Sequence, residues 1–278
     1  MARVLHVSES GYYKWLSRPH SKREEEDLIL IEMIAEIFYA SHEVFGVRKV
    51  TAVLRAGGVL VNHKRVARLM SEYCLYSKVR RVRRSFTEQG NDANICEDLI
   101  KRDFHVTAPD QKMVSDTTGI RTKQGWLYVA GILDLCGRIP VGISTGTRND
   151  TGLITAAFKD MRNRGHGGKG CILHSDRGST YTSKEYQQLI SSNDMLSSMS
   201  RKGDCWDNAP MESFWGKMKL EFCDKVYNTL EEANAAVYEY VWSFYTNLRP
   251  HAANGYLTPA QYYNKARSSQ VESVRKSL

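Results

Sequence analysis

The sequence lacks the marks of a membrane-spanning or secreted protein. It has no apolar run near the roughly 20 residues that a membrane helix needs, and its mean hydropathy is -0.45. The opening text, MARVLHVSESGYYKWL, is too polar for a secretory signal. We therefore expect a cytoplasmic protein with no membrane partner.

Paired cysteines are also lacking. No two cysteines form a CxxC pair, and no histidine pair stands near them at the spacing of a zinc site. A disulfide framework does not suit a chain of 278 residues, so we expect free thiols in a reducing compartment. The six cysteines stand at 74, 96, 136, 171, 205 and 223.

Negative charge is in the minority. The chain has 39 Lys and Arg against 31 Asp and Glu, a formal net charge of +8, which suits a polyanionic partner. The densest basic run is 78-KVRRVRR-84. Two interpretations stay open for it, a phosphate-binding segment and a solvated basic linker. The candidates for DNA contact in this run are Arg80, Arg81, Arg83 and Arg84.

The amino-terminal part of the chain has helical periodicity. Ser21 and Glu24 form a capping-box pattern that predicts the start of a helix over 21–40. A shorter helix that ends at a Gly-Gly pair follows, and then a basic helix over 62–75. This order is typical of a helix-turn-helix, although a helical hairpin with a solvated face has the same pattern. The expected DNA contacts of the basic helix are Lys64, Arg65 and Arg68.

After Pro109 the pattern changes to strands. Three strands in a row, followed by strands that alternate with helices, favour an α/β fold with a mixed five-stranded sheet flanked by helices. The strands are expected over 112–120, 126–135, 138–146, 171–175 and 195–199. The chain is thus predicted to divide into a small all-helical region, a linker, a sheet-containing core and a tail, over 1–85, 86–108, 109–265 and 266–278.

Three acids stand where a shared site could form. Asp116 lies inside the first predicted strand, and Asp176 ends the fourth in 171-CILHSDRGSTYTS-183. Glu212 follows Pro210 in the first turn of a predicted helix. Two divalent ions about 3.5–4 Å apart serve phosphodiester chemistry, and Mg²⁺ or Mn²⁺ prefers carboxylate oxygens. Spacing alone leaves a structural role open for each acid.

Three blocks of text carry a resemblance to a known family: 174-HSDRGSTYTS-183, 198-SMSRKGDCWDNAPMESFWGKMKLE-221 and 245-YTNLRPHAANGYLTPAQYY-263. They closely resemble the transposases of the IS-three family of bacterial insertion sequences, and GYYKWL, FGVRKV and KRVARLM extend the resemblance over nearly the whole chain. The catalytic region of that family is similar to retroviral integrases, which implies a ribonuclease-H-like fold and an Asp-Asp-Glu triad. Carried over residue by residue, the triad is Asp116, Asp176 and Glu212, and the base seven residues after the glutamate is Lys219.

The resemblance implies a DNA transposase subunit whose triad holds two Mg²⁺ (or Mn²⁺) ions for cleavage at an element end and strand transfer into a target. The implied partners are double-stranded DNA (terminal repeats and target), at least one further copy of the chain and an upstream-frame product, at the bacterial nucleoid. Two alternatives are a plain nuclease on the same fold and a non-catalytic or regulatory DNA-binding product. The second arises because the family's upstream helix-turn-helix and zipper are not visible here. Further expected DNA contacts are Arg201, Lys202, Lys219 and Arg249.

Several positions depart from the family pattern. The text 113-MVS-115 stands where Trp-Thr usually precedes the first aspartate, and Gly119 stands where an aromatic residue often follows. Thr246 stands in the place of an asparagine in the late motif. Asp116 is therefore the least typical member of the triad. No His-His-Cys-Cys zinc module precedes the core.

Other residues have two open interpretations. Asp134 is an alternative acid but is expected to be structural, and His174 either orients a ligand or packs as a strand histidine. Trp206 and Trp215 either pack a helix on the sheet, which we favour, or stack on bases. Arg249 either contacts phosphate or closes the domain.

Overall fold

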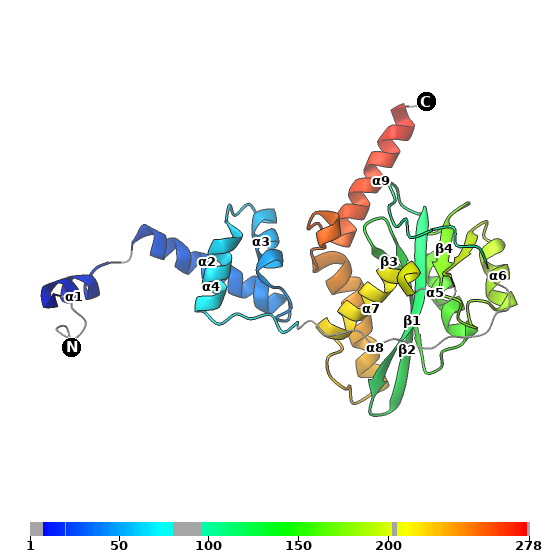
Figure 1. The fold of residues 1–278 in the computed structure, drawn as a ribbon, viewed down its shortest axis with the longest axis horizontal. Coiled ribbons are helices and arrows are strands. Elements are labelled where there is room, and N and C mark those ends of the chain that lie inside the picture. Colours follow the sequence, from blue (N-terminus) through cyan, green and yellow to red (C-terminus); the bar gives the residue numbers. More distant parts are fainter. Residues whose placement is uncertain (1–7, 20, 80–95, 202–204, 277–278) are drawn as a thin grey trace. The chain divides into compact units, whose positions relative to one another are not determined.

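A computed structural model describes residues 8–19, 21–79, 96–201 and 205–276 (Figure 1). The chain divides into two compact units, Met1–Ser77 and Lys78–Leu278. None of the described helices is both long and apolar enough to cross a membrane. The described cysteines that are unpaired thiols, as the sequence predicts, are Cys74, Cys96, Cys136, Cys171 and Cys223.

The first unit is all-helical, as predicted. Its capping box forms, because Ser21 Oγ accepts from the Glu24 amide at 3.3 Å while the Ser21 amide donates to Glu24 Oε2 at 2.6 Å. Leu28, which the helical spacing places on the apolar face, is 46% exposed, and Leu30 is buried instead. The turn between the last two helices needs a glycine, since Gly58 has φ +86°. The described helices of this unit are α1 (Glu9–Leu16), α2 (Lys22–Ala40), α3 (Val47–Ala56) and α4 (His63–Glu72).

The second unit is built on a mixed five-stranded sheet, as the sequence predicts. The strands lie in the order β3-β2-β1-β4-β5. The β1–β2 and β2–β3 pairs are antiparallel, whereas β1–β4 and β4–β5 are parallel. This is the ribonuclease-H-like arrangement that the resemblance implies. The strands are β1 (Lys112–Thr122), β2 (Gly125–Asp134), β3 (Ile139–Gly146), β4 (Ile172–Ser175) and β5 (Leu196–Met199).

Helices cover both faces of this sheet (Figure 1). On one face, Gly142 of β3 lies so close to α5 that an added Cβ would stand 2.4 Å from the Ala157 carbonyl oxygen. On the other face, Gly131 of β2 lies against Trp215 of α7. The described helices of this unit are α5 (Thr151–Asn163), α6 (Lys184–Ser191), η1 (Cys205–Asn208), α7 (Ala209–Glu221), α8 (Leu230–Tyr238), η2 (Glu239–Leu248), η3 (Ala252–Asn254) and α9 (Pro259–Lys276).

The helix that begins at Leu230 changes its winding part-way. It continues from α8 into η2, a π-helical segment, and Thr246 Oγ1 there donates to the Val241 carbonyl oxygen five residues earlier at 2.6 Å. The wider winding follows from local hydrogen bonds that periodicity does not reveal.

Residues 96–108, from the stretch that the sequence assigns to a linker, pack on the sheet unit. Ile100 and Val106 are buried, at 2% and 8% exposure. The Leu99 amide donates to Ser198 Oγ of β5 at 2.9 Å. This segment therefore lies along the edge of the sheet that leads to the predicted acids.

Candidate active site

Strand register places two of the predicted acids on one face of the sheet. Val114 of β1 is the partner of His174 on the parallel strand β4. Asp116 and Asp176 each lie two residues further along, and side chains two residues apart in a strand share a face. Asp116 is opposite Gly131 of β2, the glycine that contacts α7, so this face is the one that α7 covers.

Asp176 is held by the turn that ends β4. Its Oδ1 accepts from the Gly178 amide at 2.9 Å, which is why a polar Asp-Arg-Gly sequence follows an apolar strand. The Ser200 amide donates to the Ser175 carbonyl oxygen at 3.0 Å and extends the contact between β4 and the segment after β5. Asp176 lies at the strand end with part of its surface open to solvent.

Glu212 lies in the first turn of α7, as predicted, with Pro210 before it. Asn208 occupies the N-cap position, but its side chain makes no capping bond to the helix. Its Nδ2 donates instead to the Ser115 carbonyl oxygen at 3.1 Å. This bond ties the start of the Glu212 helix to the residue just before Asp116.

The pKa of Asp116 records how close these charges are. Burial raises this pKa to about 8, and the charges of Asp176 and Glu212 add to the rise. The Thr117 backbone bond and the Lys219 charge act in the opposite direction. Burial also raises the pKa of Asp176. The fold therefore brings three acids and one base within electrostatic reach of one another.

These acids are suited to a divalent cation by chemistry. Carboxylates that repel one another in a partly desolvated place are stabilised by a hard cation, for which oxygen is the preferred ligand. Within the described ranges, however, no three His, Cys, Asp or Glu side chains are close enough together to hold one ion. The donor atoms fit Mg²⁺ or Mn²⁺ by type.

Comparison with known proteins identifies the family. The Integrase core domain matches residues 106–205, a second family with that description matches 193–259, and the HTH-like domain matches 23–83. A Shigella sonnei protein described as "Insertion element IS600 uncharacterized 31 kDa protein" is 36% identical over 267 residues, covering 95% of this chain and 98% of that protein. "Transposase InsF for insertion sequence IS3A" of Escherichia coli (strain K12) is 33% identical, covering 95% of this chain and 93% of that protein. The chain belongs to the IS3 family of insertion-sequence transposases.

A solved structure has a similar sheet domain. The HTLV-2 integrase catalytic core domain in complex with magnesium matches with a TM-score of 0.42 and 18% identity, covering 56% of this chain and 97% of that one.

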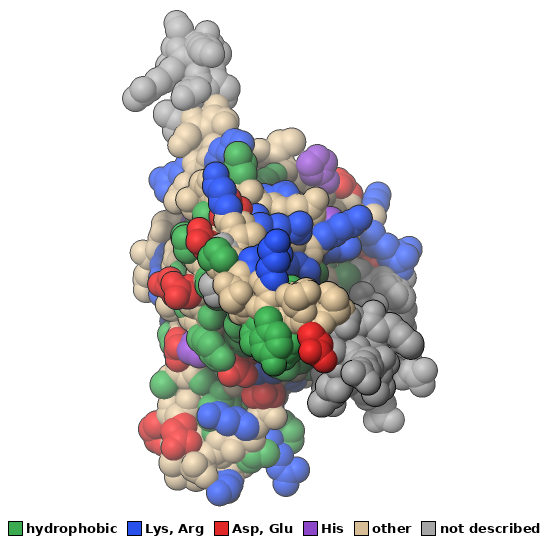
Figure 2. Space-filling model, turned by 90° about the vertical axis from the view of Figure 1, so that its left-hand side faces the viewer, with side chains coloured by type: hydrophobic (Ala, Val, Ile, Leu, Met, Phe, Trp, Pro, Cys, Tyr) green, Lys and Arg blue, Asp and Glu red, His purple; other side chains and the backbone are tan. Residues whose placement is uncertain are grey.

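Among the expected DNA contacts of this IS3-family chain, some basic side chains pair with acids of the same unit and others are exposed to solvent. Arg65 Nε donates to Asp27 at 2.6 Å, and Arg68 pairs with Asp27 and Glu72, so both arginines neutralise acids of the helical unit. Lys64 is exposed. Figure 2 shows many Lys and Arg side chains on one face, mixed with acidic ones. The expected contacts that lie outside the described residues are Arg80, Arg81, Arg83, Arg84 and Lys202.

Arg249 lies inside the IS3-family catalytic domain, away from any surface that DNA could reach. Its side chain is 6% exposed and its Nη2 donates to Glu221 Oε1 at 2.5 Å. Of the two interpretations open for this residue, domain closure is the one that its contacts support.

Other residues near the acids have structural contacts. His174 is fully buried, with Nδ1 2.8 Å from Ser198 Oγ and Nε2 3.2 Å from Ser200 Oγ, as expected of a packed strand histidine. Asp134 is also buried and accepts from the Asp110 and Cys136 amides at 2.7 and 2.8 Å. Burial raises the pKa of Asp134 to about 7, and its bonds support the structural role expected of it.

Near the candidate site, Asp207 binds two arginines in an arrangement that no sequence pattern predicts. Asp207 accepts from Arg102 at 2.8 Å and from the Arg201 amide at 2.9 Å, which joins residues 96–108 to the segment before α7. Arg201, an expected DNA contact, thus lies next to the Glu212 helix with its side chain 56% exposed. A pair 105 residues apart in the chain has no local pattern that could predict it.

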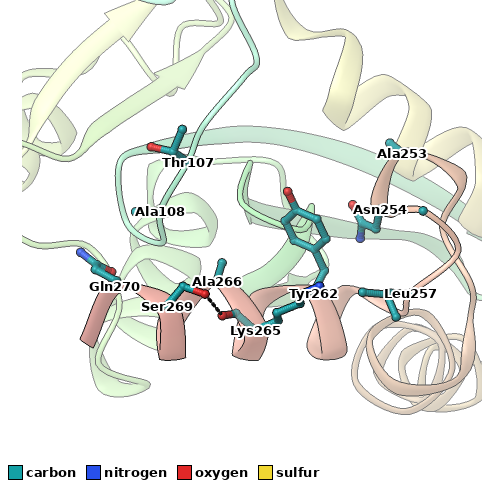
Figure 3. Close-up of a pocket in the computed structure, with 11 residues that line it drawn as sticks. Thr107, Ala108, Ala253, Asn254, Leu257, Tyr262, Lys265, Ala266, Ser269 and Gln270 are labelled. Atoms are coloured by element: carbon teal, nitrogen blue, oxygen red, sulfur yellow. Dashed lines mark hydrogen bonds between the residues drawn. The ribbon is translucent and has the colours of Figure 1, made fainter. Parts of the chain in front are cut away.

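A separate pocket lies between α9 and the loop around η3 (Figure 3). Thr107, Asn254, Tyr262 and Lys265 are among its lining residues. None of the predicted acids lines it, so it is not part of the candidate active site.

Proposed function

We propose that this chain cleaves DNA at insertion-sequence ends and joins the released strand to a target, with Asp116, Asp176 and Glu212 as ligands of two Mg²⁺ or Mn²⁺ ions. The observation that carries the proposal is geometric: strand register gives Asp116 and Asp176 a common face of the sheet, and the bond from Asn208 to Ser115 ties the start of the Glu212 helix to β1. The raised pKa of Asp116, caused by burial and by the charges of Asp176 and Glu212, agrees with this arrangement. Acids that a fold gathers from a strand interior, a strand end and a helix start cost stability unless a cation is bound, and such perturbed groups concentrate at functional sites.

Each residue has a separate part in this proposal. Asp116, Asp176 and Glu212 would hold the ions, which would supply activation of the attacking hydroxyl or water and stabilisation of the leaving 3′-oxygen. Asp116 is rigid because it lies within a paired strand, and Asp176 is oriented by its turn. Glu212 is attached to a helix start that is bonded to β1. Lys219 lies two turns further along α7 and is exposed, so its ammonium group is available to a DNA phosphate beside the acids.

The proposed partners follow from the family and from charge. The HTH-like unit and the net charge of +8 support binding to double-stranded DNA, both terminal repeats and target. We propose that DNA cleavage and joining take place at the nucleoid, in the bacterial cytoplasm. We further propose that at least two copies act together on DNA, with an upstream-frame product as an additional partner. Relatives described as transposases favour this function over the regulatory and nuclease alternatives.

A strand-transfer assay tests the proposal. The chain is incubated with Mg²⁺ and a labelled duplex of an element end, and we expect joined as well as cleaved products. Glu212→Gln should reduce both by more than about 100-fold, because it removes a charged ligand. Glu231→Gln, which removes an exposed acid on α8, should leave both unchanged. Cleaved products without joined ones would indicate a nuclease, and no metal-dependent product would indicate a regulatory protein.

A further inference from the structure

Gly131 of β2 lies directly against the ring of Trp215 on α7. A Cβ added there would stand 2.8 Å from Trp215 Cη2, 2.9 Å from Cζ2 and 3.2 Å from Ile143 Cδ1. The backbone of Gly131 is ordinary β-strand, so its conformation does not require glycine. The requirement comes from the indole ring that occupies the place of a side chain.

This contact lies next to two of the proposed ligands. Gly131 is the cross-strand partner of Asp116, and Trp215 follows Glu212 by three residues, so the two α7 side chains share one face of the helix. Trp215 is 4% exposed, and its Nε1 donates to none of the described groups. The position of the Trp215 ring is therefore set by packing against Gly131 and its neighbours, not by a hydrogen bond.

We propose that Gly131 and Trp215 are positioning residues for Glu212. The absent side chain at 131 lets α7 approach β2 closely enough to bring Glu212 to Asp116, while Asn208 fixes the start of the same helix. The inference rests on the proposed function, in which Glu212 is a metal ligand. It adds that the distance between helix and sheet is set by a glycine on a strand that carries no ligand of its own.

The decisive variant is Gly131→Ala. The shortest ordinary contact for a Cβ is 3.4 Å, so a contact of 2.8 Å must lengthen by 0.6 Å (3.4 − 2.8). Displacements of about 1 Å in a catalytic arrangement cost on the order of 100-fold in rate. We expect strand transfer to fall about 10- to 100-fold, and Mn²⁺ binding, followed by the electron paramagnetic resonance signal of the unbound ion, to weaken about 10-fold.

A second change should reverse this loss. Trp215→Phe removes the two ring carbons that an alanine at 131 would meet, so the Gly131→Ala/Trp215→Phe double variant should regain Mn²⁺ binding to within about 3-fold of wild type. The matched control is Gly119→Ala. Gly119 is on the same β1–β2 ladder, but its side chain position faces away from Asp116. An added Cβ there comes closest to the half-exposed Trp126, at 3.0 Å, and next to Tyr128, at 3.7 Å. This control should bind Mn²⁺ and join DNA as the wild type does.

Each outcome decides the inference. Weaker Mn²⁺ binding by Gly131→Ala, with recovery in the double variant, supports the inference. If Gly131→Ala does not fold, recovery of both folding and Mn²⁺ binding in the double variant also supports it. A Gly131→Ala protein that binds and joins like the wild type overturns the inference alone, as does a double variant that folds without recovery. If the wild type neither binds Mn²⁺ nor joins DNA, the proposed function is wrong, and the inference is wrong with it.

Discussion

Replacing Arg249 with methionine distinguishes a side chain that closes the domain from one that contacts DNA. The guanidinium makes close contacts with Glu221: Nε is 2.7 Å from Oε2 and 3.1 Å from Oε1, and Nη2 is 2.5 Å from Oε1. The two side chains are 6% and 2% exposed. Burial by itself would lower the pKa of Arg249, but the bonds to Glu221 outweigh burial and raise it.

The expected cost follows from the buried acid left behind. In Arg249→Met, Glu221 keeps the Tyr240 hydroxyl at 3.1 Å but loses its cation. Breaking a buried pair by removing one partner costs about 3–5 kcal/mol. In a domain of this size each kcal/mol lowers the melting temperature by about 2–4 °C, so we expect a fall of about 10 °C. The salt dependence of DNA binding by the folded protein should not change, because no phosphate contact is lost.

Two further variants serve as controls for Arg249→Met. All variants are compared by thermal melts and by salt titrations of DNA binding. Arg148→Met removes an arginine that is 84% exposed and 3.6 Å from Asp150, and should cost less than about 1 kcal/mol. Glu221→Gln with Arg249→Met removes both buried charges and should recover part of the lost stability. The reasoning is refuted if Arg249→Met melts like the wild type while the slope of log affinity against log salt falls by about one.

Two further predictions concern stability. The bonds from Arg201 and Arg102 lower the pKa of Asp207 to about 2 against the opposing effect of burial, so Asp207 stabilises the fold above about pH 4 and this contribution is lost as pH falls toward 2. In urea unfolding, the free energy of unfolding of the wild type should exceed that of Asp207→Asn by about 1 kcal/mol less at pH 3 than at pH 6. A difference that stays constant with pH would contradict the lowered pKa of Asp207. Ser21→Ala removes the capping box of α2 and should cost about 1 kcal/mol in the helical unit, visible in circular dichroism melts, whereas Ser71→Ala inside α4 should cost little. Equal melting of the two serine variants would show that the cap is not stabilising.

Local patterns were sufficient to predict most of the secondary structure. The capping box at Ser21 and the glycine turn after α3 depend on residues a few positions apart, and both form as predicted. The strands of the mixed sheet follow from alternation and turn residues, which are also local. The change of winding between α8 and η2 was not predictable, because apolar periodicity does not reveal hydrogen bonds such as the one from Thr246 to the Val241 carbonyl oxygen.

The candidate site was only partly predictable. The family motifs identify Asp116, Asp176 and Glu212 as proposed ligands, and the register of β1 and β4 gives the first two a common face. No spacing rule reveals that Arg249 pairs with Glu221, or that Arg65 pairs with Asp27, since each pair joins residues far apart in the chain. A basic residue in a motif is chemically the same whether it binds a phosphate or a carboxylate.

Local sequence patterns were enough to tell helices from strands, because caps, turns and apolar periods act over a few residues and do not depend on the rest of the chain. The sequence also determined the family, through motifs that occur in several blocks. Which side chains contact one another depends on the fold as a whole. A glycine in β2 matters because α7 packs on it, and an arginine is withdrawn from solvent because an acid 28 residues earlier occupies the same interior. Such contacts depend on how elements far apart in the chain pack together, and spacing along the sequence does not give their distance in space.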